Sequence, residues 1–278
     1  MPNLVTVVGR NTHLLPHMIK HYSDIVDDLY VVVYRQDEND TILQEVEECG
    51  VVPYKVVTEP KYDWSVVTSI YNQIKLEKPN DWWIVSDDDE LQVYPDSLEN
   101  IIRNCENSGY KFVTGGFLDR IGVDGTFPEV KRDTDIHKTF PYAGHFRHPM
   151  SGACPNKVTL MKGDIQVTPG QHYARIDGEV TWGDKHPLRM PIEQCFTQVH
   201  HFKWDSSVLE RLLEVAETKT LVSFHKEYNK MYRAIARSDF KIDIKNSEYF
   251  VEKLKNFSYI DYNDYPHWDK LRDIIVKI

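Results

Sequence analysis

The sequence has 278 residues, of which 41% are hydrophobic, and a formal net charge of −10. This length suits one large domain, or one domain with a helical annex. The charge argues against nucleic acid or an anionic membrane as a partner, because both are held by clustered Lys and Arg, and no basic stretch occurs here. An acidic protein that binds a phosphorylated ligand needs a local positive centre. A divalent cation held by carboxylates supplies one.

The cysteines lie far apart in the sequence, and no Cys-x-x-Cys pair indicates a zinc or redox site. We therefore expect reduced, buried thiols at Cys49, Cys105, Cys154 and Cys195. The apolar run at the N-terminus is too short for a signal peptide, and nowhere do about eighteen apolar residues occur together. We expect a soluble, cytoplasmic protein with no integral membrane segment.

The first hundred residues alternate between β-branched runs and amphipathic stretches. This pattern predicts strand-helix-strand units around a mostly parallel sheet. The expected strands are 4–8, 29–34, 51–57 and 82–85. The expected helices are 12–22, 41–49 and a third that Asp63 caps and that ends before Pro79. The fold class is therefore α/β.

After residue 95 the pattern predicts a helix at 97–107 and a strand at 111–118, and then a Gly- and Pro-punctuated region that we leave unassigned. Further strands are expected at 157–161 and 195–204. Polar helical segments follow at 206–217, 222–237, 247–256 and 268–276. Their apolar faces need a surface to bury. We expect an α/β core at 1–205 and a C-terminal helical extension at 206–278 that packs on it.

In open α/β sheets the ligand lies beyond the carboxyl ends of the strands, so polar residues there are candidates for the site. Asp87, Asp88 and Asp89 follow the apolar strand 82–85 directly. Consecutive carboxylates repel one another unless they share a positive charge. Mg²⁺ and Mn²⁺ take oxygen ligands, which the Asp-x-Asp spacing of Asp87 and Asp89 presents. The alternative is a solvated, helix-capping turn, and the position after a buried strand favours the metal.

Four features together resemble the GT-A glycosyltransferases, particularly the nucleotide-sugar-dependent enzymes related to family 2. The first is the segment 4–10 that opens the fold, and the second is Asp63-Trp64-Ser65 before the third helix. The third is the Asp-x-Asp motif within 86–90, and the fourth is His200-His201-Phe202-Lys203-Trp204. The resemblance covers about residues 3–205. It implies a Rossmann-like GT-A sheet. It also implies transfer of a sugar, with inversion, from a nucleotide-diphosphate sugar to a glycan or other hydroxyl acceptor. UDP is the family's commonest nucleotide.

The resemblance also implies roles for the acidic motif. Asp87 would contact the donor's ribose or the ion, Asp88 would belong to the donor site, and Asp89 would be the direct metal ligand. A late histidine often completes the metal shell in such enzymes, which selects His201, with His200 as the alternate. Alternation along a strand turns these two rings to opposite faces, so one at most reaches the site. An imidazole among oxygen ligands suits Mn²⁺ better than Mg²⁺.

Other donor-site candidates follow the first strands. Gly9, Arg10 and Arg35 lie where this fold places the nucleotide, and a surface role is the alternative for the arginines. Asp63 and Trp64 can bind uridine and stack on it, although Asp63 is equally well explained as a helix N-cap. His172 lines the acceptor side or is a structural histidine.

The acceptor hydroxyl needs a general base, and an ionised carboxylate is the usual one. Asp119 is the first candidate because it follows the strand 111–118, and Arg120 beside it would hold it ionised. Asp177, Glu179 and Glu193 remain alternatives.

Two other functions compete with glycosyl transfer. A nucleotidyltransferase would use the same fold type and metal but normally has a Gly-rich basic loop after the first strand, and residues 9–12 contain one glycine. It ranks second. A non-catalytic glycan- or nucleotide-binding module is the third possibility. A phosphatase of the Asp-x-Asp-x-Thr kind is disfavoured because residue 91 is Leu.

Overall fold

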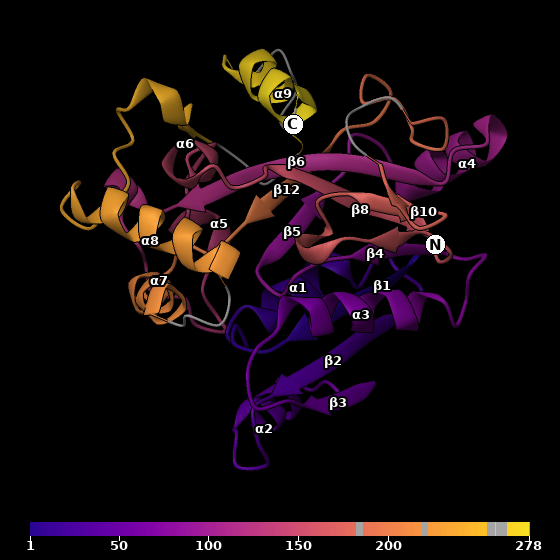
Figure 1. Cartoon of the computed structure of the whole chain (residues 1–278), viewed down its shortest axis with the longest axis horizontal. Coiled ribbons are helices and arrows are strands. Elements are labelled where there is room, and N and C mark those ends of the chain that lie inside the picture. Colours follow the sequence, from indigo (N-terminus) through magenta and orange to yellow (C-terminus); the bar gives the residue numbers. More distant parts are fainter. Residues whose placement is uncertain (182–185, 218–221, 255–258, 260–265, 278) are drawn as a thin grey trace. The chain divides into compact units, whose positions relative to one another are not determined.

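The computed structural model describes residues 1–181, 186–217, 222–254, 259 and 266–277. The chain divides into two units, and each is discontinuous in sequence. The first unit contains Met1–Gly116, Asn156–Val199 and Val276–Ile278, and the second contains Phe117–Pro155 and His200–Ile275. The chain therefore leaves the first unit, returns to it at Asn156 and leaves it again at His200 (Figure 1).

Parallel strands form the centre of the first unit. Its main strands are β1 (Asn3–Val8), β2 (Leu29–Arg35), β3 (Lys55–Thr58), β4 (Trp82–Val85), β6 (Phe112–Ile121) and β8 (Asn156–Lys162). Strands β3, β2, β1 and β4 lie side by side in that order, and each pair is parallel. β8 pairs with β4 in antiparallel fashion, and the first half of β6 pairs likewise with β8.

Helices cover both faces of this sheet. They are α1 (Leu15–Tyr22), α2 (Ile42–Glu48) and α3 (Trp64–Lys75), and α4 (Leu98–Ser108) follows later. Successive residues of β1 point to opposite faces. Val5 and Val7 share a core with residues of α3, whereas Val8 shares another with residues of α1 and α2. The predicted fold class is confirmed: an α/β fold with a mostly parallel sheet flanked by helices.

Most predicted elements of the first unit are observed within a few residues. The strands expected at 4–8, 29–34, 82–85 and 157–161 are confirmed, while β3 begins at Lys55. The remaining elements are β5 (Glu90–Val93), β9 (Gln166–Val167), η2 (Pro169–Gln171), β10 (Ala174–Ile176), β11 (Glu179–Val180) and β12 (Thr197–His201). Strands β9, β10 and β11 form a small separate sheet.

The second unit combines the unassigned region with the C-terminal helices. Its elements are η1 (Val123–Gly125), α5 (Ile136–Thr139), β7 (Tyr142–Gly144), α6 (Arg147–Ser151), α7 (Val208–Glu217), α8 (Val222–Ala236), η3 (Ser247–Tyr249), β13 (Glu252–Lys253) and α9 (Trp268–Lys277). Its core joins Ile121, Phe146 and Trp204 to apolar residues of α7 and α8, among them Leu212 and Met231. The apolar faces of these helices are thus buried inside the unit.

The helix predicted at 247–256 is wrong. Residues 247–249 form the short helix η3, and β13 pairs with β7 in antiparallel fashion. Between them Phe250 has a φ of 49°, a left-handed conformation that an α-helix does not tolerate. Pairing with a distant strand has overridden the local helical pattern. Residues 255 and 256 of the predicted helix lie outside the described part of the chain.

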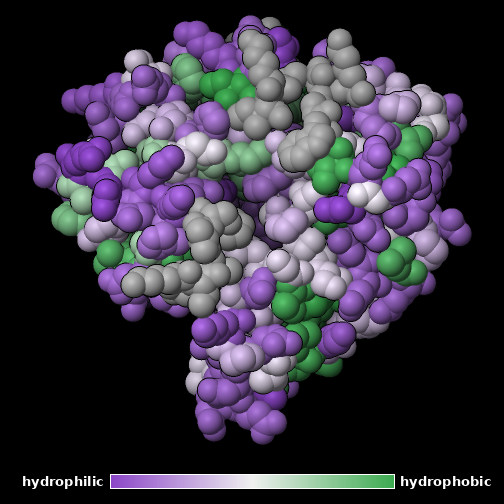
Figure 2. All heavy atoms as spheres, viewed as in Figure 1, coloured by the Kyte–Doolittle hydropathy of each residue, from purple (hydrophilic) through white to green (hydrophobic). Residues whose placement is uncertain are grey.

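The surface is mainly hydrophilic on the face shown in Figure 2, with hydrophobic areas that are small and separate, in keeping with the high charge. Within the described residues, no helix is both long enough and apolar enough to cross a membrane. Cys105 and Cys195 are buried as expected, whereas Cys49 and Cys154 are partly exposed, which corrects that part of the prediction.

Lys75 is a fully buried lysine near the end of α3. Its Nζ donates a hydrogen bond to the carbonyl oxygen of Ile165 and lies 3.2 Å from Sδ of Met161. Burial lowers the pKa of Lys75 from 10.5 to about 7. The unfolded chain therefore binds more protons than the folded one between about pH 7 and 10.5, so stability attributable to this residue rises with pH in that window.

We expect Lys75→Met to remove this pH dependence. Relative to the variant, the parent should gain up to about 1.4 kcal/mol of unfolding free energy per pH unit between about pH 7.5 and 10. Urea denaturation at several pH values measures the slope. Lys20→Met, at an exposed lysine of α1, should reproduce the parental slope. Parallel curves for parent and Lys75→Met would contradict the prediction.

Candidate functional site

The acidic turn 86–90 lies at the carboxyl edge of the parallel strands, as predicted. It follows β4, whose neighbour β1 leads into the loop that begins at Gly9. The backbone N–H of Ser86 donates to the carbonyl oxygen of Val5, 3.3 Å away, which ties the start of the turn to β1. The position agrees with the rule that open α/β sheets bind ligands at this edge.

Asp88 holds the loop after β1. Its carboxylate accepts hydrogen bonds from the backbone N–H groups of Gly9 (3.4 Å) and Asn11 (3.3 Å), and from the Asn11 side-chain amide (2.6 Å). Burial and the neighbouring charge of Asp89 raise the pKa of Asp88 to about 6. A Cβ at Gly9 would lie 2.9 Å from the Tyr62 ring, so the loop also depends on a glycine. The hydrogen bond between Gly9 and Asp88 thus holds the loop after β1 against the acidic turn.

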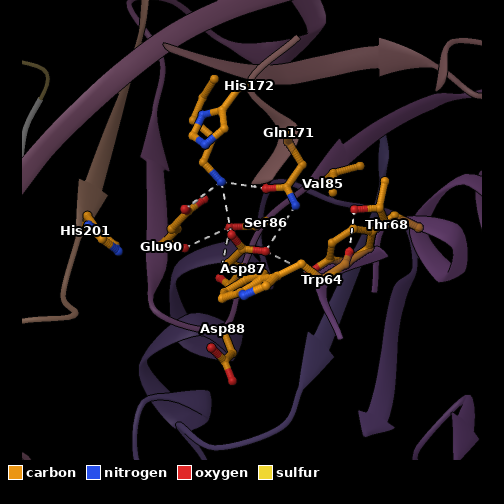
Figure 3. A network of polar contacts seen from close by, with 12 residues as sticks. Trp64, Thr68, Val85, Ser86, Asp87, Asp88, Glu90, Gln171, His172 and His201 are labelled. Atoms are coloured by element: carbon orange, nitrogen blue, oxygen red, sulfur yellow. Dashed lines mark hydrogen bonds and ion pairs between the residues drawn. The ribbon is translucent and has the colours of Figure 1, made fainter. Parts of the chain in front are cut away.

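Lys157 neutralises the other side of the turn. Its Nζ lies 3.0 Å from Oδ2 of Asp87 and 2.7 Å from Oε1 of Glu90, and its side chain is 2% exposed. Tyr71 and Gln171 also donate hydrogen bonds to Asp87, at 3.0 and 3.1 Å. Figure 3 shows Asp87 within this network, with Gln171 directed toward it. Burial alone would raise the pKa of Asp87, but the charge of Lys157 holds this pKa below its ordinary value.

The sequence did not reveal these partners. Repulsion among the carboxylates suggested a metal as the shared positive charge, but the protein supplies one itself through Lys157 of β8. The available signal was a lysine opening a buried strand. Asp89 is half-buried, and its carboxylate oxygens are ligands of the kind that hard divalent cations take.

An aromatic cluster links two of the predicted donor-site residues. The guanidinium of Arg10 lies 5.7 Å from the ring centroid of Tyr62, which contacts Trp64 edge to face at 5.0 Å. Asp63 caps α3, accepting a hydrogen bond from the N–H of Ser65 at 2.7 Å, in line with its capping alternative. The ring of Tyr62 was not among the predicted site residues.

The remaining first-unit candidates have separate positions. Arg35 donates from Nε to the Thr58 hydroxyl at 3.0 Å, at the ends of β2 and β3. Nδ1 of His172 lies 2.8 Å from the carbonyl oxygen of Asn156, which matches the structural alternative. The alternative bases Asp177, Glu179 and Glu193 are all exposed.

Asp119 lies in the second unit and is completely buried. It accepts hydrogen bonds from Nδ1 of His201 (2.9 Å), Nε1 of Trp204 (2.9 Å) and the backbone N–H of Arg147 (3.3 Å). Burial alone raises its pKa, but the bonds from His201 and Trp204 hold the pKa of Asp119 below its ordinary value. The expectation that Arg120 keeps Asp119 ionised is wrong.

Alternation along the strands explains that correction. Arg120 follows Asp119 on β6, so its side chain points to the other face, where it contacts Nδ1 of His200 at 3.0 Å and the carbonyl oxygen of Phe140. His201 contacts Asp119 instead. A carboxylate bonded to one ring nitrogen orients the other, an arrangement typical of metal-binding imidazoles. These contacts favour a positioning role for Asp119, and its predicted role as base stays a prediction.

Comparisons with known proteins gave weak structural similarity alone. No protein-family model matches the chain, and no curated protein does. A fragment of S. aureus TarS, residues 1-349 in complex with UDP, has a TM-score of 0.34 at 13% identity, covering 88% of this chain and 74% of that one.

Two other similar structures are a putative glucose-1-phosphate thymidylyltransferase from Bacillus anthracis in complex with a sucrose and a 4-diphosphocytidyl-2C-methyl-D-erythritol synthase. The first has a TM-score of 0.29 at 12% identity and covers 84% of this chain and 82% of that one. The second has a TM-score of 0.30 at 14% identity and covers 59% of this chain and 76% of that one. TM-scores of this size carry no conclusion on function.

Proposed function

We propose that this protein is a metal-dependent glycosyltransferase. It transfers a sugar from a nucleotide-diphosphate sugar, with a UDP-sugar as the first candidate, to a hydroxyl acceptor such as a glycan. The observation that supports it is the acidic turn at the carboxyl edge of β1 and β4. There Asp87 and Asp89 present carboxylate oxygens at Asp-x-Asp spacing, and Asp89 is half-buried. A divalent cation held by such oxygens turns an acidic surface into one that attracts a diphosphate.

Within this proposal Asp89 is the direct metal ligand and Asp87 its partner at Asp-x-Asp spacing. Lys157, Tyr71 and Gln171 fix Asp87, so the turn needs little reorganisation when a ligand arrives. When bound, Mn²⁺ or Mg²⁺ neutralises the charge that develops on the leaving nucleoside diphosphate. His201 stays a predicted ligand, and Asp119, which binds its Nδ1, orients it.

One contact ranks glycosyl transfer above nucleotidyl transfer. Loops that cradle a nucleoside triphosphate present their backbone N–H groups to the phosphates. In this protein the N–H groups of Gly9 and Asn11 are directed to the carboxylate of Asp88. The loop after β1 is therefore closed by a protein anion at the place where a nucleotidyltransferase would receive its substrate.

Metal-dependent donor binding tests the proposal. UDP titrated into the protein by calorimetry should bind about tenfold or more tightly with Mn²⁺ than with a chelator, a difference of about 1.4 kcal/mol per factor of ten. In a thermal-shift screen, a nucleotide sugar at a hundred times its Kd should add about 2.7 kcal/mol of stability. Equal UDP affinity with and without metal would overturn the proposal. Release of pyrophosphate from a sugar phosphate and a nucleoside triphosphate would favour the nucleotidyltransferase.

A further inference from the structure

Lys203 is a buried cation in the second unit, outside the acidic turn. It is 6% exposed. Its Nζ donates to the Tyr228 hydroxyl at 2.7 Å and lies 4.0 Å from the centroid of the same ring. Lys203 forms no salt bridge with any carboxylate that the structure describes. An ammonium has three donors, and a buried charge with few partners is costly. Lys203 can therefore donate further hydrogen bonds from Nζ.

Two other side chains of the second unit also have nitrogen atoms without a hydrogen-bond partner among the described residues. Arg147 pairs with Glu227 through Nη2 at 3.1 Å, yet its Nε is buried and has no hydrogen-bond partner among the described residues. His145 is 1% exposed, and within the same described residues neither of its ring nitrogens has a partner. The nearby carboxylate of Asp119 is already bonded to His201 and Trp204.

The partners of both cations are consecutive residues of one helix. Lys203 donates to the hydroxyl of Tyr228, and Arg147 pairs with Glu227, the residue before Tyr228 on α8. Lys203, Arg147 and Tyr228 therefore form one polar cluster. The cluster meets solvent at the pair Arg147 and Glu227, whose side chains are 14% and 20% exposed.

We propose that Lys203, Arg147 and Tyr228 form a binding site for a phosphoryl oxyanion. A phosphate group has several acceptor oxygens, which can take hydrogen bonds from the Lys203 ammonium, Nε of Arg147 and the Tyr228 hydroxyl together. Hydrogen bonds between charged partners of this kind are stronger than neutral ones. All three residues belong to the second unit, and none of them is a proposed metal ligand, so this site goes beyond the proposed metal site.

Two sources supply this chemistry: the diphosphate of the donor, or a phosphate on the acceptor. Calorimetric titration of inorganic phosphate, in the presence of a chelator, tests the site without assuming either. The parent should bind phosphate, and Lys203→Met should bind it about tenfold to a hundredfold more weakly. Methionine replaces the ammonium by an apolar chain of similar length. Tyr228→Phe, which keeps the ring, should lose about twofold to tenfold.

Lys226→Met is the matched control, because this lysine is exposed on the same helix as Tyr228. It should bind phosphate as the parent does. Circular dichroism should show that all variants keep the parental fold. The alternative is that Lys203 is a neutral amine that needs no anion. Absence of phosphate binding by the parent, or equal binding by parent and Lys203→Met, would overturn the proposal.

Competition with UDP under the same chelated conditions identifies the source. If UDP displaces phosphate and binds Lys203→Met more weakly, the site takes the donor's diphosphate. If phosphate and UDP bind together, the site takes a phosphate carried by the acceptor. Both results support the site. The effect of Mn²⁺ on UDP affinity is a separate measurement. The proposed metal-dependent function can therefore fail while phosphate binding at this site is confirmed, and phosphate binding can fail while the metal dependence is confirmed.

Discussion

Replacing Lys157 with Met is expected to lower the free energy of unfolding by about 3–5 kcal/mol. Lys157 is buried at 2% side-chain exposure and contacts Asp87 and Glu90, of which Glu90 is equally buried. The variant leaves both carboxylates in place without their shared counter-charge. An uncompensated buried charge is far more costly than a well-packed apolar pair. Urea denaturation of parent and variant at pH 7 measures the loss.

A matched control lies on the same strand. Lys162 of β8 pairs with Glu106, but its side chain is 21% exposed, so Lys162→Met should change stability by about 1 kcal/mol or less. Combining Lys157→Met with Glu90→Gln should recover part of the loss, because one stranded charge is then removed. Equal losses at Lys157 and Lys162 would show that the buried network contributes little.

Asp89→Asn is expected to remove the gain in UDP affinity that Mn²⁺ provides, while the fold stays intact. The amide keeps one oxygen donor but removes the formal charge that offsets the cation's desolvation. Asp87 cannot replace the lost charge of Asp89, because Lys157 already neutralises the carboxylate of Asp87. Without metal, the variant should be as stable as the parent or slightly more so, since one member of a repelling carboxylate group is gone.

Calorimetric titration of UDP into parent and Asp89→Asn, each with Mn²⁺ and with chelator, gives four affinities. The parent with Mn²⁺ should bind most tightly, and the other three should agree within about twofold, or about 0.4 kcal/mol. Asp24→Asn, at an exposed aspartate, is the control and should follow the parent. Four equal affinities would exclude the metal site and with it the main support for glycosyl transfer.

Local patterns were sufficient to place the early strands and helices and the acidic turn. The strand 82–85 and the carboxylates after it form a continuous stretch, so periodicity located both. The partner of Asp87 could not be found in this way. Lys157 lies 70 positions later, on a strand that pairs with β4 in antiparallel fashion, and this pairing is a property of the tertiary fold.

The second unit was less accessible to prediction for the same physical reason. β13 is too short to show a period of two, and it exists because it pairs with β7 about 110 positions earlier in the chain. Adjacent residues of a strand point to opposite faces, which excludes Arg120 as a partner of Asp119. The contact of Asp119 with His201, 82 positions later, depends on the tertiary fold.

The order in which the ribosome makes these parts follows from the discontinuous first unit. Asp87 leaves the ribosome 70 residues before Lys157, and the segment 117–155 of the second unit comes between them. At about 5–20 residues per second the acidic turn spends about 4 to 14 s without its counter-ion. Throughout that interval the nascent sheet also lacks β8, so β4 has an unpaired edge. A chaperone that shields unpaired strand edges could therefore bind the nascent sheet at β4 during this interval.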